Sequence, residues 1–457
     1  MNTHQNLWRL LLGGVLLLAC GVCALAQGDA RIAGTVKDQS GAVIPNATVI
    51  VKNTRTGEAR TATSNGEGAF LLAALKPSVY TVQVAAANFA KSEYTNIELV
   101  IGQALNLEAE LKPAGASESV NIVGGEEAAL DTSSARMGAN VNEKEVKELP
   151  LNGRQLSQLY LQAPGALNSG SGTFGDIRFS GRAVEQNAVR YDGVEGSAII
   201  DASPGNFNGE IASPFRLQAS LENVQEFRVE SNSYPAEYGT GTGGQVSVVT
   251  KSGGNQFHGS VFEYLRNDAL DARNFFDNLN FKAPLKLNQF GASLGGPIIK
   301  DKFFFFGSYE GYRVRSGINI VEGVPKLSRC ASAVAAVQAL CTSAFLASGA
   351  TRIVTDPNTS PDFDIGRLVG SNPINENSGA IRFDYRASDK NTFYARFFRD
   401  QGDNDQPQNV SGARAIYKSV PQNGVAAWQT TIGGTKINEL KLGYNSAYSR
   451  VRGAAPT

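Results

Sequence analysis

Apolar and polar residues alternate with a period of two through most of the chain, which predicts a protein built mainly from β-strands. In residues 27–113 the alternating stretches are short, and turn residues such as Asn65-Gly66 and Lys76-Pro77 separate them. This spacing is typical of a small β-sandwich. The strands that we expect there are Arg31–Val36, Thr48–Lys52, Arg60–Thr63, Ala69–Leu72, Tyr80–Ala85, Ile97–Val100 and Leu105–Leu111.

The next part of the chain mixes the helical and strand periods. Residues 114–125 form a linker of small residues, and residues 126–252 follow as a second unit of mixed αβ character. Its expected helices are Glu143–Leu149 and Gln155–Leu161. Its expected strands are Ile177–Arg182, Val189–Val194, Val224–Glu230 and Val246–Ser252.

In residues 253–457 the alternation sets an apolar side against a charged or polar side. In Ile381–Arg386 three apolar residues alternate with three charged ones, and Gln289–Leu294 and Leu440–Asn445 repeat the pattern with polar partners. A lipid-facing side and a wet side are typical of an outer-membrane β-barrel. We expect an outer loop at Val314–Ser378 and aromatic girdles at Phe303–Phe306, Tyr309, Tyr312, Phe393, Tyr394, Phe397 and Phe398.

The chain starts with a segment typical of an export signal. Arg9 precedes an apolar run, and Ala24-Leu25-Ala26 forms an A-x-A site, which predicts a signal peptide of residues 1–26 cleaved between Ala26 and Gln27. The run is shorter than the ~20 residues that a membrane-spanning helix needs. A rival interpretation is lipidation of Cys20, since Leu17–Cys20 loosely resembles a lipoprotein cleavage box.

Two cysteines remain after removal of this signal. Cys330 and Cys341 form an even pair in an oxidising compartment, so we favour a disulfide across a loop. The alternative is two unpaired cysteines on a short alanine-rich helix.

Composition narrows the function. Lys plus Arg and Asp plus Glu both number 42, so the formal net charge is zero, which argues against nucleic-acid binding. The signal leaves His258 as the one histidine, which we expect at the start of the first barrel strand and not in a catalytic set. Asp400, Asp403 and Asp405 are expected in an acidic loop that is solvated and not a calcium site. We therefore predict no enzyme, no cofactor and no metal site.

Particular strings carry resemblances to known families. RIAGTVKDQSGAVIPNATVIVKN followed by TATSNGEGAFLLAALKPSVYTVQVAAANF resembles a carboxypeptidase regulatory-like domain, a fold also described as carbohydrate-binding-like. The strings DTSSARMGANVNEKEVKELPLNGRQLSQLYLQAPGA, RYDGVEG and NVQEFRVESNSYPAEYGTGTGGQVSVVTKSGGNQFHGSVFEY resemble the plug of TonB-dependent outer-membrane receptors of the Oar-like subtype.

The second resemblance implies a partner and a location. It implies that the periplasmic protein TonB grasps the extended stretch Ser119, Val120, Asn121, Ile122 and Val123 by strand addition. It also implies energised uptake of a bulky extracellular ligand, a carbohydrate or a peptide among the candidates. The N-terminal domain would lie in the periplasm and the barrel in outer-membrane lipid.

The fold class that follows is mainly β: a signal peptide, a small sandwich, a mixed αβ plug and the first strands of a transmembrane antiparallel barrel. The family's barrel needs several hundred residues, so we expect this chain to be a fragment of a longer product. The alternative function is a non-transporting surface adhesin or carbohydrate-binding protein, in which Tyr80, Phe89 and Tyr94 stack on a sugar.

Overall fold

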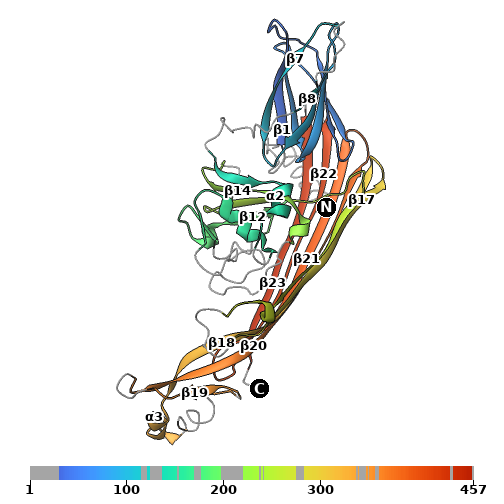
Figure 1. Cartoon of the computed structure of the whole chain (residues 1–457). Coiled ribbons are helices and arrows are strands. Elements are labelled where there is room, and N and C mark those ends of the chain that lie inside the picture. Colours follow the sequence, from blue (N-terminus) through green and yellow to red (C-terminus); the bar gives the residue numbers. More distant parts are fainter. Residues whose placement is uncertain are drawn as a thin grey trace, which may run out of the picture.

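Three units follow one another along the chain and lie against each other in a computed structural model (Figure 1). We call them the sandwich (residues 30–113), the central unit (136–252) and the barrel sheet (258–454). The structure describes residues 30–114, 121–123, 136–151, 154–168, 177–196, 220–235, 238–239, 241–273, 282–335, 338, 346–347, 349–355, 360–432 and 436–454. The predicted signal, its cleavage site Ala26/Gln27 and Cys20 lie outside these residues.

The seven strands expected in the sandwich are present and form two sheets. One sheet has the order β4-β1-β7, and the other has the order β3-β2-β5-β6-β8, in which β8 is an eighth strand, Asn121–Val123. Inward apolar residues of both sheets, Ile32, Val49 and Val82 among them, are fully buried in a single core. The strands are β1 Ala30–Asp38, β2 Thr48–Asn53, β3 Ala59–Thr63, β4 Ala69–Leu75, β5 Ser78–Ala85, β6 Ser92–Leu99 and β7 Ala104–Leu111.

The closeness of β1 and β7 depends on a glycine. A Cβ atom on Gly34 would lie 1.9 Å from the carbonyl oxygen of Leu107 on the parallel neighbour strand. Gly34→Ala should therefore destabilise the sandwich by about 1–3 kcal/mol, the usual cost of overpacking. The change in stability is measured by the thermal unfolding of the sandwich, with limited proteolysis as the probe of unfolding.

The matched control is Gly66→Ala, because no atom lies within 4 Å of the Cβ that it adds in an open turn. It should shift stability by less than about 0.5 kcal/mol. Equal melting of the two variants would contradict the tight packing of β1 on β7.

The central unit is a five-stranded mixed sheet with short helices. Its sheet order is β13-β12-β15-β14-β9, and β10 and β11 form a separate pair. The strands are β9 Met137–Val141, β10 Ala166–Asn168, β11 Ile177–Phe179, β12 Ala188–Tyr191, β13 Val194–Glu195, β14 Val224–Asn232 and β15 Gln245–Thr250. Helix α2 spans Glu143–Glu148, and 3-10 helices span Leu156–Gln162, Val184–Gln186 and Leu221–Asn223.

Local sequence sets the start of α2. The side chain of Asn142 accepts a hydrogen bond from the backbone of Glu145, and the Glu145 carboxylate accepts one from the backbone of Asn142. This reciprocal capping box satisfies two backbone donors that a helix start leaves free.

The barrel sheet is an antiparallel meander of long strands in the order β16-β17-β18-β20-β21-β22-β23, with β19 paired to β20. The strands are β16 His258–Asn267, β17 Leu285–Ile299, β18 Phe303–Pro325, β19 Thr351–Ile353, β20 Phe363–Arg386, β21 Asn391–Pro407, β22 Arg414–Ile432 and β23 Lys436–Ala454. A 3-10 helix spans Asp268–Leu270, and helix α3 spans Leu327–Ala331.

The two faces of this sheet have inverted polarity. Leu440 and Leu442 are exposed on the outer face, whereas Gln289, Glu310 and Glu376 are buried on the inner face. A water-soluble sheet would bury its apolar side, so exposure of the apolar side fits contact with lipid. The predicted mainly β fold with barrel strands is confirmed.

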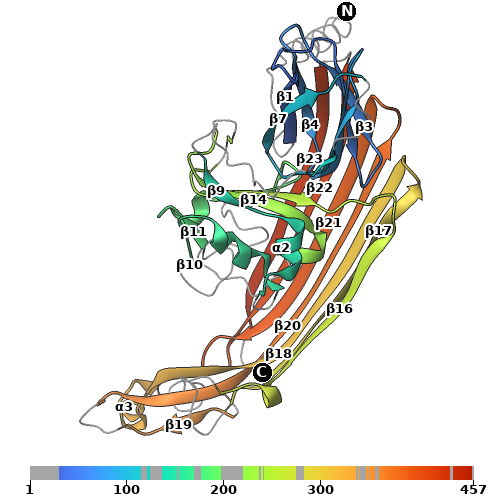
Figure 2. The same cartoon turned by 45° about the horizontal axis from the view of Figure 1, so that its top comes forward.

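The central unit covers the inner face of the barrel sheet (Figure 2). The apolar core of the central unit includes Phe398 of β21, whose ring meets that of Tyr191 edge to face at 5.0 Å between centroids. The two units therefore share one core.

The expected outer loop Val314–Ser378 is wrong in its bounds. Strands β18 and β20 stay paired from Phe303 and Tyr385 to Pro325 and Phe363, so the connection spans residues 326–362. A barrel strand needs only about 9–11 residues to cross a membrane. Beyond that length the ladder between β18 and β20 continues, and this part of the hairpin buries a small apolar cluster of Ile320, Val324 and Val410.

The aromatic girdle is correct for one face only. Phe303, Tyr385, Phe393 and Trp428 pair in one row across four neighbouring strands, and the rings of Phe393 and Trp428 stack 6.1 Å apart. Side chains alternate between the faces of a strand. Other aromatics assigned to the girdle therefore point inward and are buried: Phe304, Phe306, Tyr312 and Phe398.

Within the described ranges, no helix has the length and apolar character that a membrane-crossing helix requires.

Candidate functional site

A two-residue turn presents Asp192 to the barrel sheet. Asp192 and Gly193 join β12 to β13 with φ angles of 50° and 81°. Two positive φ angles match a type I′ hairpin turn, which Asp-Gly favours because aspartate tolerates the left-handed region and glycine has no Cβ. The local sequence thus sets the position of this carboxylate at the tip of the hairpin.

Two arginines of the barrel sheet lie opposite each other beneath this turn. Arg382 of β20 pairs with Arg396 of β21 in the antiparallel ladder. The exposed fractions of their side chains are 6% and 1%. Like charges that face each other across a ladder repel, and burial removes the water that would screen them. A buried anion is needed to offset both.

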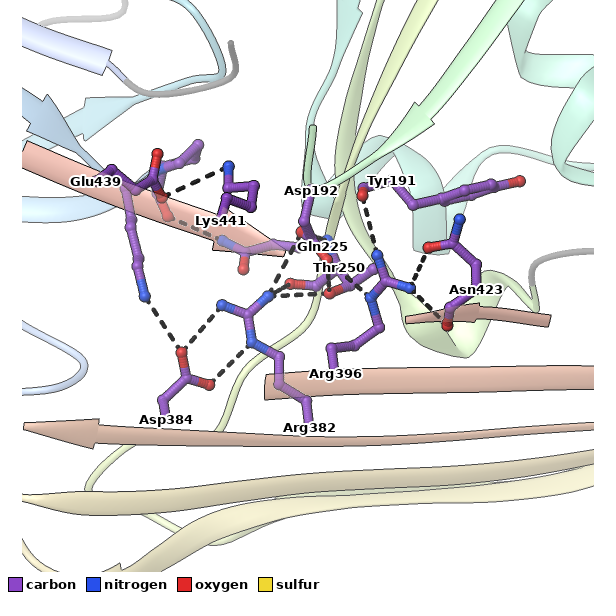
Figure 3. A network of polar contacts seen from close by, with 12 residues as sticks. Tyr191, Asp192, Gln225, Thr250, Arg382, Asp384, Arg396, Asn423, Glu439 and Lys441 are labelled. Atoms are coloured by element: carbon purple, nitrogen blue, oxygen red, sulfur yellow. Dashed lines mark hydrogen bonds and ion pairs between the residues drawn. The ribbon is translucent and has the colours of Figure 1, made fainter. Parts of the chain in front are cut away.

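Asp192 supplies this anion. Its Oδ2 lies 3.0 Å from Nε of Arg396, and its Oδ1 lies 3.5 Å from Nη1 of Arg382. The backbone N–H and the hydroxyl of Thr250 donate to the same carboxylate at 3.0 and 2.8 Å. Arg382 in turn donates to the carbonyl and hydroxyl oxygens of Thr250 at 3.1 and 2.9 Å. Charge-assisted hydrogen bonds therefore join the central unit to the barrel sheet (Figure 3).

The remaining donors of Arg396 are also satisfied. They reach the carbonyl oxygen of Tyr191 at 2.9 Å and the backbone and side-chain oxygens of Asn423 at 3.0 and 2.6 Å. Asn423 donates to the carbonyl oxygen of Glu195 at 3.1 Å. Both sides of the Asp192 turn are thereby held by β21 and β22.

A second carboxylate extends these contacts to the sandwich. Asp384 accepts two hydrogen bonds from Arg382, at 2.9 and 3.0 Å. Its Oδ1 also lies 3.2 Å from Nζ of Lys76 in the sandwich. The ring of Tyr394 faces both cations, 4.7 Å from Lys76 Nζ and 4.8 Å from the Arg382 guanidinium carbon. We call Lys76, Asp192, Thr250, Arg382, Asp384 and Arg396 the arginine network.

Asp192 remains ionised in this setting. Burial alone would raise the pKa of its carboxyl, but Arg396, Arg382 and the hydrogen bonds from Thr250 outweigh burial and lower it below the ordinary 3.8. The carboxylate therefore carries its charge at every physiological pH.

A second polar contact joins the central unit to the first barrel strands. The guanidinium of Arg154 lies 2.9 Å from the carboxylate of Glu222 and over the ring of Phe262 at 4.3 Å. Glu222 accepts hydrogen bonds from Ser260 at 2.6 Å and Ser293 at 3.1 Å. The central unit therefore contacts the first strands of the barrel sheet, β16 and β17, as well as its later strands β20 and β21.

The predicted TonB-contact stretch is described in part. Ser119 and Val120 lie outside the described residues, whereas Asn121–Val123 form strand β8. Strand β8 pairs in parallel with β6, with Ile122 opposite Tyr94, and it is the edge strand of its sheet.

The predicted disulfide is also only partly described. Cys330 lies buried in helix α3 and is disulfide-bonded. Cys341 lies outside the described residues, so its pairing with Cys330 stays a prediction.

The residues of the barrel region that were considered as chemical sites, His258 and three aspartates, lie in strands of the barrel sheet. His258 begins β16, and its Nδ1 lies 3.0 Å from the carbonyl oxygen of Gln256. The prediction of an acidic loop is wrong, because Asp400, Asp403 and Asp405 lie within strand β21. Asp400 is buried, and Asp405 pairs with Arg414 at 2.6 Å. Across the described residues, no group of three His, Cys, Asp or Glu is arranged to hold a metal ion.

The aromatic residues proposed to stack on a sugar belong to the sandwich core. Tyr80 and Tyr94 have exposed fractions of 4% and 5%, and Phe89 packs against the same core. The hydroxyl of Tyr80 donates to the carbonyl oxygen of Lys76 at 2.7 Å. The rings of Tyr80 and Tyr94 leave no face for a ligand, so that expectation is wrong for these two residues, whereas Phe89 is half-buried and its role stays a prediction.

Sequence reasoning did not single out Asp192, Arg382 or Arg396 as site residues. The Asp-Gly pair within RYDGVEG is a turn signal, and the alternation in Ile381–Arg386 placed Arg382 on the wet side. Neither signal indicates that residues about 190 positions apart meet, because the contact is created by packing.

Two segments of the chain match known protein families. Residues 31–112 match the family described as carboxypeptidase regulatory-like domain, and residues 249–456 match the outer membrane beta barrel domain. The chain is 31% identical over 309 residues to the TonB-dependent transporter Oar of Myxococcus xanthus. The chain is therefore similar to a TonB-dependent transporter and contains a segment that matches an outer membrane beta barrel domain. It is located in the outer membrane, as the barrel match indicates.

The chain spans about a quarter of the length of this Myxococcus relative. The matched region is 64% of this chain and 27% of the Myxococcus protein. Among solved structures, the siderophore receptor PirA of Acinetobacter baumannii is similar at 16% identity, a TM-score of 0.37, and coverage of 67% of this chain and 43% of that one. The outer membrane transporter YddB of Escherichia coli is similar at 14% identity, a TM-score of 0.43, and coverage of 65% and 37%.

Proposed function

We propose that this protein takes part in TonB-dependent, energised uptake of a bulky ligand across the outer membrane. The central unit would be the plug of the barrel. The arginine network is the observation that carries this proposal. It fixes the central unit, whose sheet is separate from the barrel sheet, to the inner face of the barrel strands by hydrogen bonds and ion pairs, which can break and form again. The relative named a TonB-dependent transporter supports the same function.

The proposed orientation follows from the two ends of the barrel sheet. Short turns join β17 to β18 and β20 to β21 at the end nearest the sandwich, whereas β18 and β20 are joined by residues 326–362 at the other end. Outer-membrane barrels have short periplasmic turns and longer extracellular loops. The sandwich therefore faces the periplasm, and the long hairpin with Cys330 reaches the ligand outside.

The proposed coupling segment is Ser119–Val123, and TonB is the proposed partner. Within the part of the chain that the structure describes, strand β8 is the edge of its sheet, and a further strand can add to such an edge. Such an added strand would give TonB a backbone grip that tolerates many side chains.

Val120→Pro and Ile122→Pro should each abolish energy-dependent uptake and cross-linking to TonB, because proline lacks the N–H that a paired strand donates. Surface abundance of the receptor should stay unchanged. Uptake of labelled peptides and oligosaccharides, with and without an uncoupler of the proton-motive force, measures the effect.

Ile122→Val is the matched control, because it keeps the N–H group and the strand propensity. It should retain uptake and TonB cross-linking. Normal TonB cross-linking of both proline variants would refute this coupling segment.

A further inference from the structure

The sandwich lies over the short-turn end of the barrel sheet, next to the central unit (Figures 1 and 2). Its contacts with the other units come from three connections and one strand, and the β2–β3 connection carries Arg55. The β6–β7 connection carries Ile101, and the β4–β5 connection carries Lys76 and Pro77. Strand β3 carries Arg60.

The contacts with the central unit are direct. The backbone N–H of Ile101 donates to the buried carboxyl of Glu226 at 2.5 Å, and the side chain of Gln225 donates to the carbonyl oxygen of Pro77 at 3.1 Å. Arg55 forms an ion pair with Glu143 at 3.2 Å.

The contacts with the barrel sheet come from two cations. Lys76 lies 3.2 Å from Asp384, and Arg60 donates to the side-chain oxygen of Gln429 at 2.5 Å. Asp384 is also bound by Arg382, which in turn binds Asp192 and Thr250 of the central unit. The same arginine therefore links the docked sandwich to the docked central unit.

We propose that the sandwich is a periplasmic gate: docked through Lys76, Arg60 and Ile101 it closes the exit beside the central unit, and it must undock before a bulky ligand leaves. This gate rests on the proposed function of uptake. The cavity lined by the docked units has a volume of about 110 Å³, which is too small for a bulky ligand to occupy. Its lining includes Thr56, Lys76, Gln225, Ser252 and Asp384, which come from all three units.

The position of β8 indicates how the gate opens. Strand β8 is hydrogen-bonded to β6 of the sandwich, and β6 leads directly into the connection that carries Ile101. A pull on the coupling segment therefore acts on the sandwich and on its contact with Glu226. The ion pair of Lys76 with Asp384 breaks with the same movement, which releases one partner of Arg382.

The test uses the accessibility of Ser252→Cys in the whole chain in isolated outer membranes. A bulky maleimide–polyethylene glycol added from the periplasmic side should label this cysteine slowly, because the docked sandwich covers it. Lys76→Glu places two carboxylates together and should speed labelling roughly tenfold, since a lost contact between partly buried charges shifts the docking equilibrium by about that factor.

Two controls isolate the gate. Lys37→Glu makes the same charge change in the ion pair of Lys37 with Glu108 inside the sandwich and should leave labelling unchanged. Bridging Arg60→Cys and Gln429→Cys with a short bifunctional maleimide should hold the sandwich in place and suppress the faster labelling of the Lys76→Glu background. Equal labelling of Ser252→Cys in the wild-type background, the Lys76→Glu variant and the bridged protein would overturn the gate.

The isolated membranes contain no energy source, so this result is independent of TonB. In energised cells, labelling of Ser252→Cys should rise and should fall again with an uncoupler. Loss of this energy dependence, with the Lys76→Glu effect intact, would refute coupled uptake and leave the gate standing.

Discussion

Asp192→Asn should destabilise the docking of the central unit on the barrel sheet by about 3–5 kcal/mol, the cost of removing one partner from a buried charge pair. The substitution keeps the size of the side chain but removes the charge that lies between Arg382 and Arg396. The two guanidinium groups would then face each other in the ladder with Asp384 as their one remaining carboxylate partner among the described contacts. Urea titration followed by limited proteolysis of the central unit measures the loss.

The control for this experiment is Asp389→Asn. Asp389 forms an ion pair with Arg386 in a short turn, but its side chain is 87% exposed. An exposed pair contributes about 0–1 kcal/mol, so this variant should be close to the wild type. Similar urea midpoints for the two variants would show that Asp192 does not hold the central unit.

The pH dependence of the Asp192 contribution has a defined sign. The pKa of Asp192 is lowered in the folded protein, so its stabilising effect is complete above the ordinary value of 3.8 and is lost as pH falls through the lower folded value. The difference between wild type and Asp192→Asn should therefore be constant from pH 8 to pH 5 and should shrink only in strong acid.

The contact between the sandwich and the central unit should instead weaken as pH rises through the neutral range. Burial, helped by the nearby carboxylates of Glu98 and Glu143 and opposed by the hydrogen bond from the Ile101 N–H, raises the pKa of Glu226 to about 8. In the undocked state the carboxyl is solvated and returns toward its ordinary value of 4.5. At a pH between these two pKa values, docking is accompanied by the uptake of a proton by Glu226. Low pH therefore favours docking.

The size of this pH effect on docking follows from the number of protons that docking takes up. Docking should weaken by up to about tenfold for each pH unit between about 5 and 8. The labelling rate of Ser252→Cys, divided by that of Gly66→Cys in an exposed turn, measures docking without the pH dependence of the thiol reaction.

Glu226→Gln tests the origin of the pH effect. The amide oxygen can still accept the hydrogen bond of Ile101, but the side chain no longer titrates. The variant should dock as the wild type does at pH 5 and should keep that docking at pH 8. The same pH profile in both proteins would exclude Glu226 as the titrating group.

The sequence alone determined the strands of the sandwich and which face of a barrel strand is apolar. Alternation located the seven sandwich strands, and in Ile381–Arg386 it placed the apolar side of β20 outward and Arg382 inward. These features depend on each residue and its near neighbours, since strand period, turn propensity and capping act over a few positions. Resemblance added the similarity to TonB-dependent outer-membrane receptors, and the chain is 31% identical over 309 residues to one TonB-dependent transporter.

Only the tertiary structure decided where the units meet. The ion pairs of Asp192 with Arg396 and of Lys76 with Asp384 join residues that are far apart in the chain, and the sequence pattern contains no distance information of that range. Packing also decided which aromatics are buried: Phe398 and Phe397 are neighbours in the sequence, yet Phe398 contacts Tyr191 while Phe397 faces outward. A contact between units depends on how whole faces fit together, and a local pattern specifies only which face of a strand a side chain occupies.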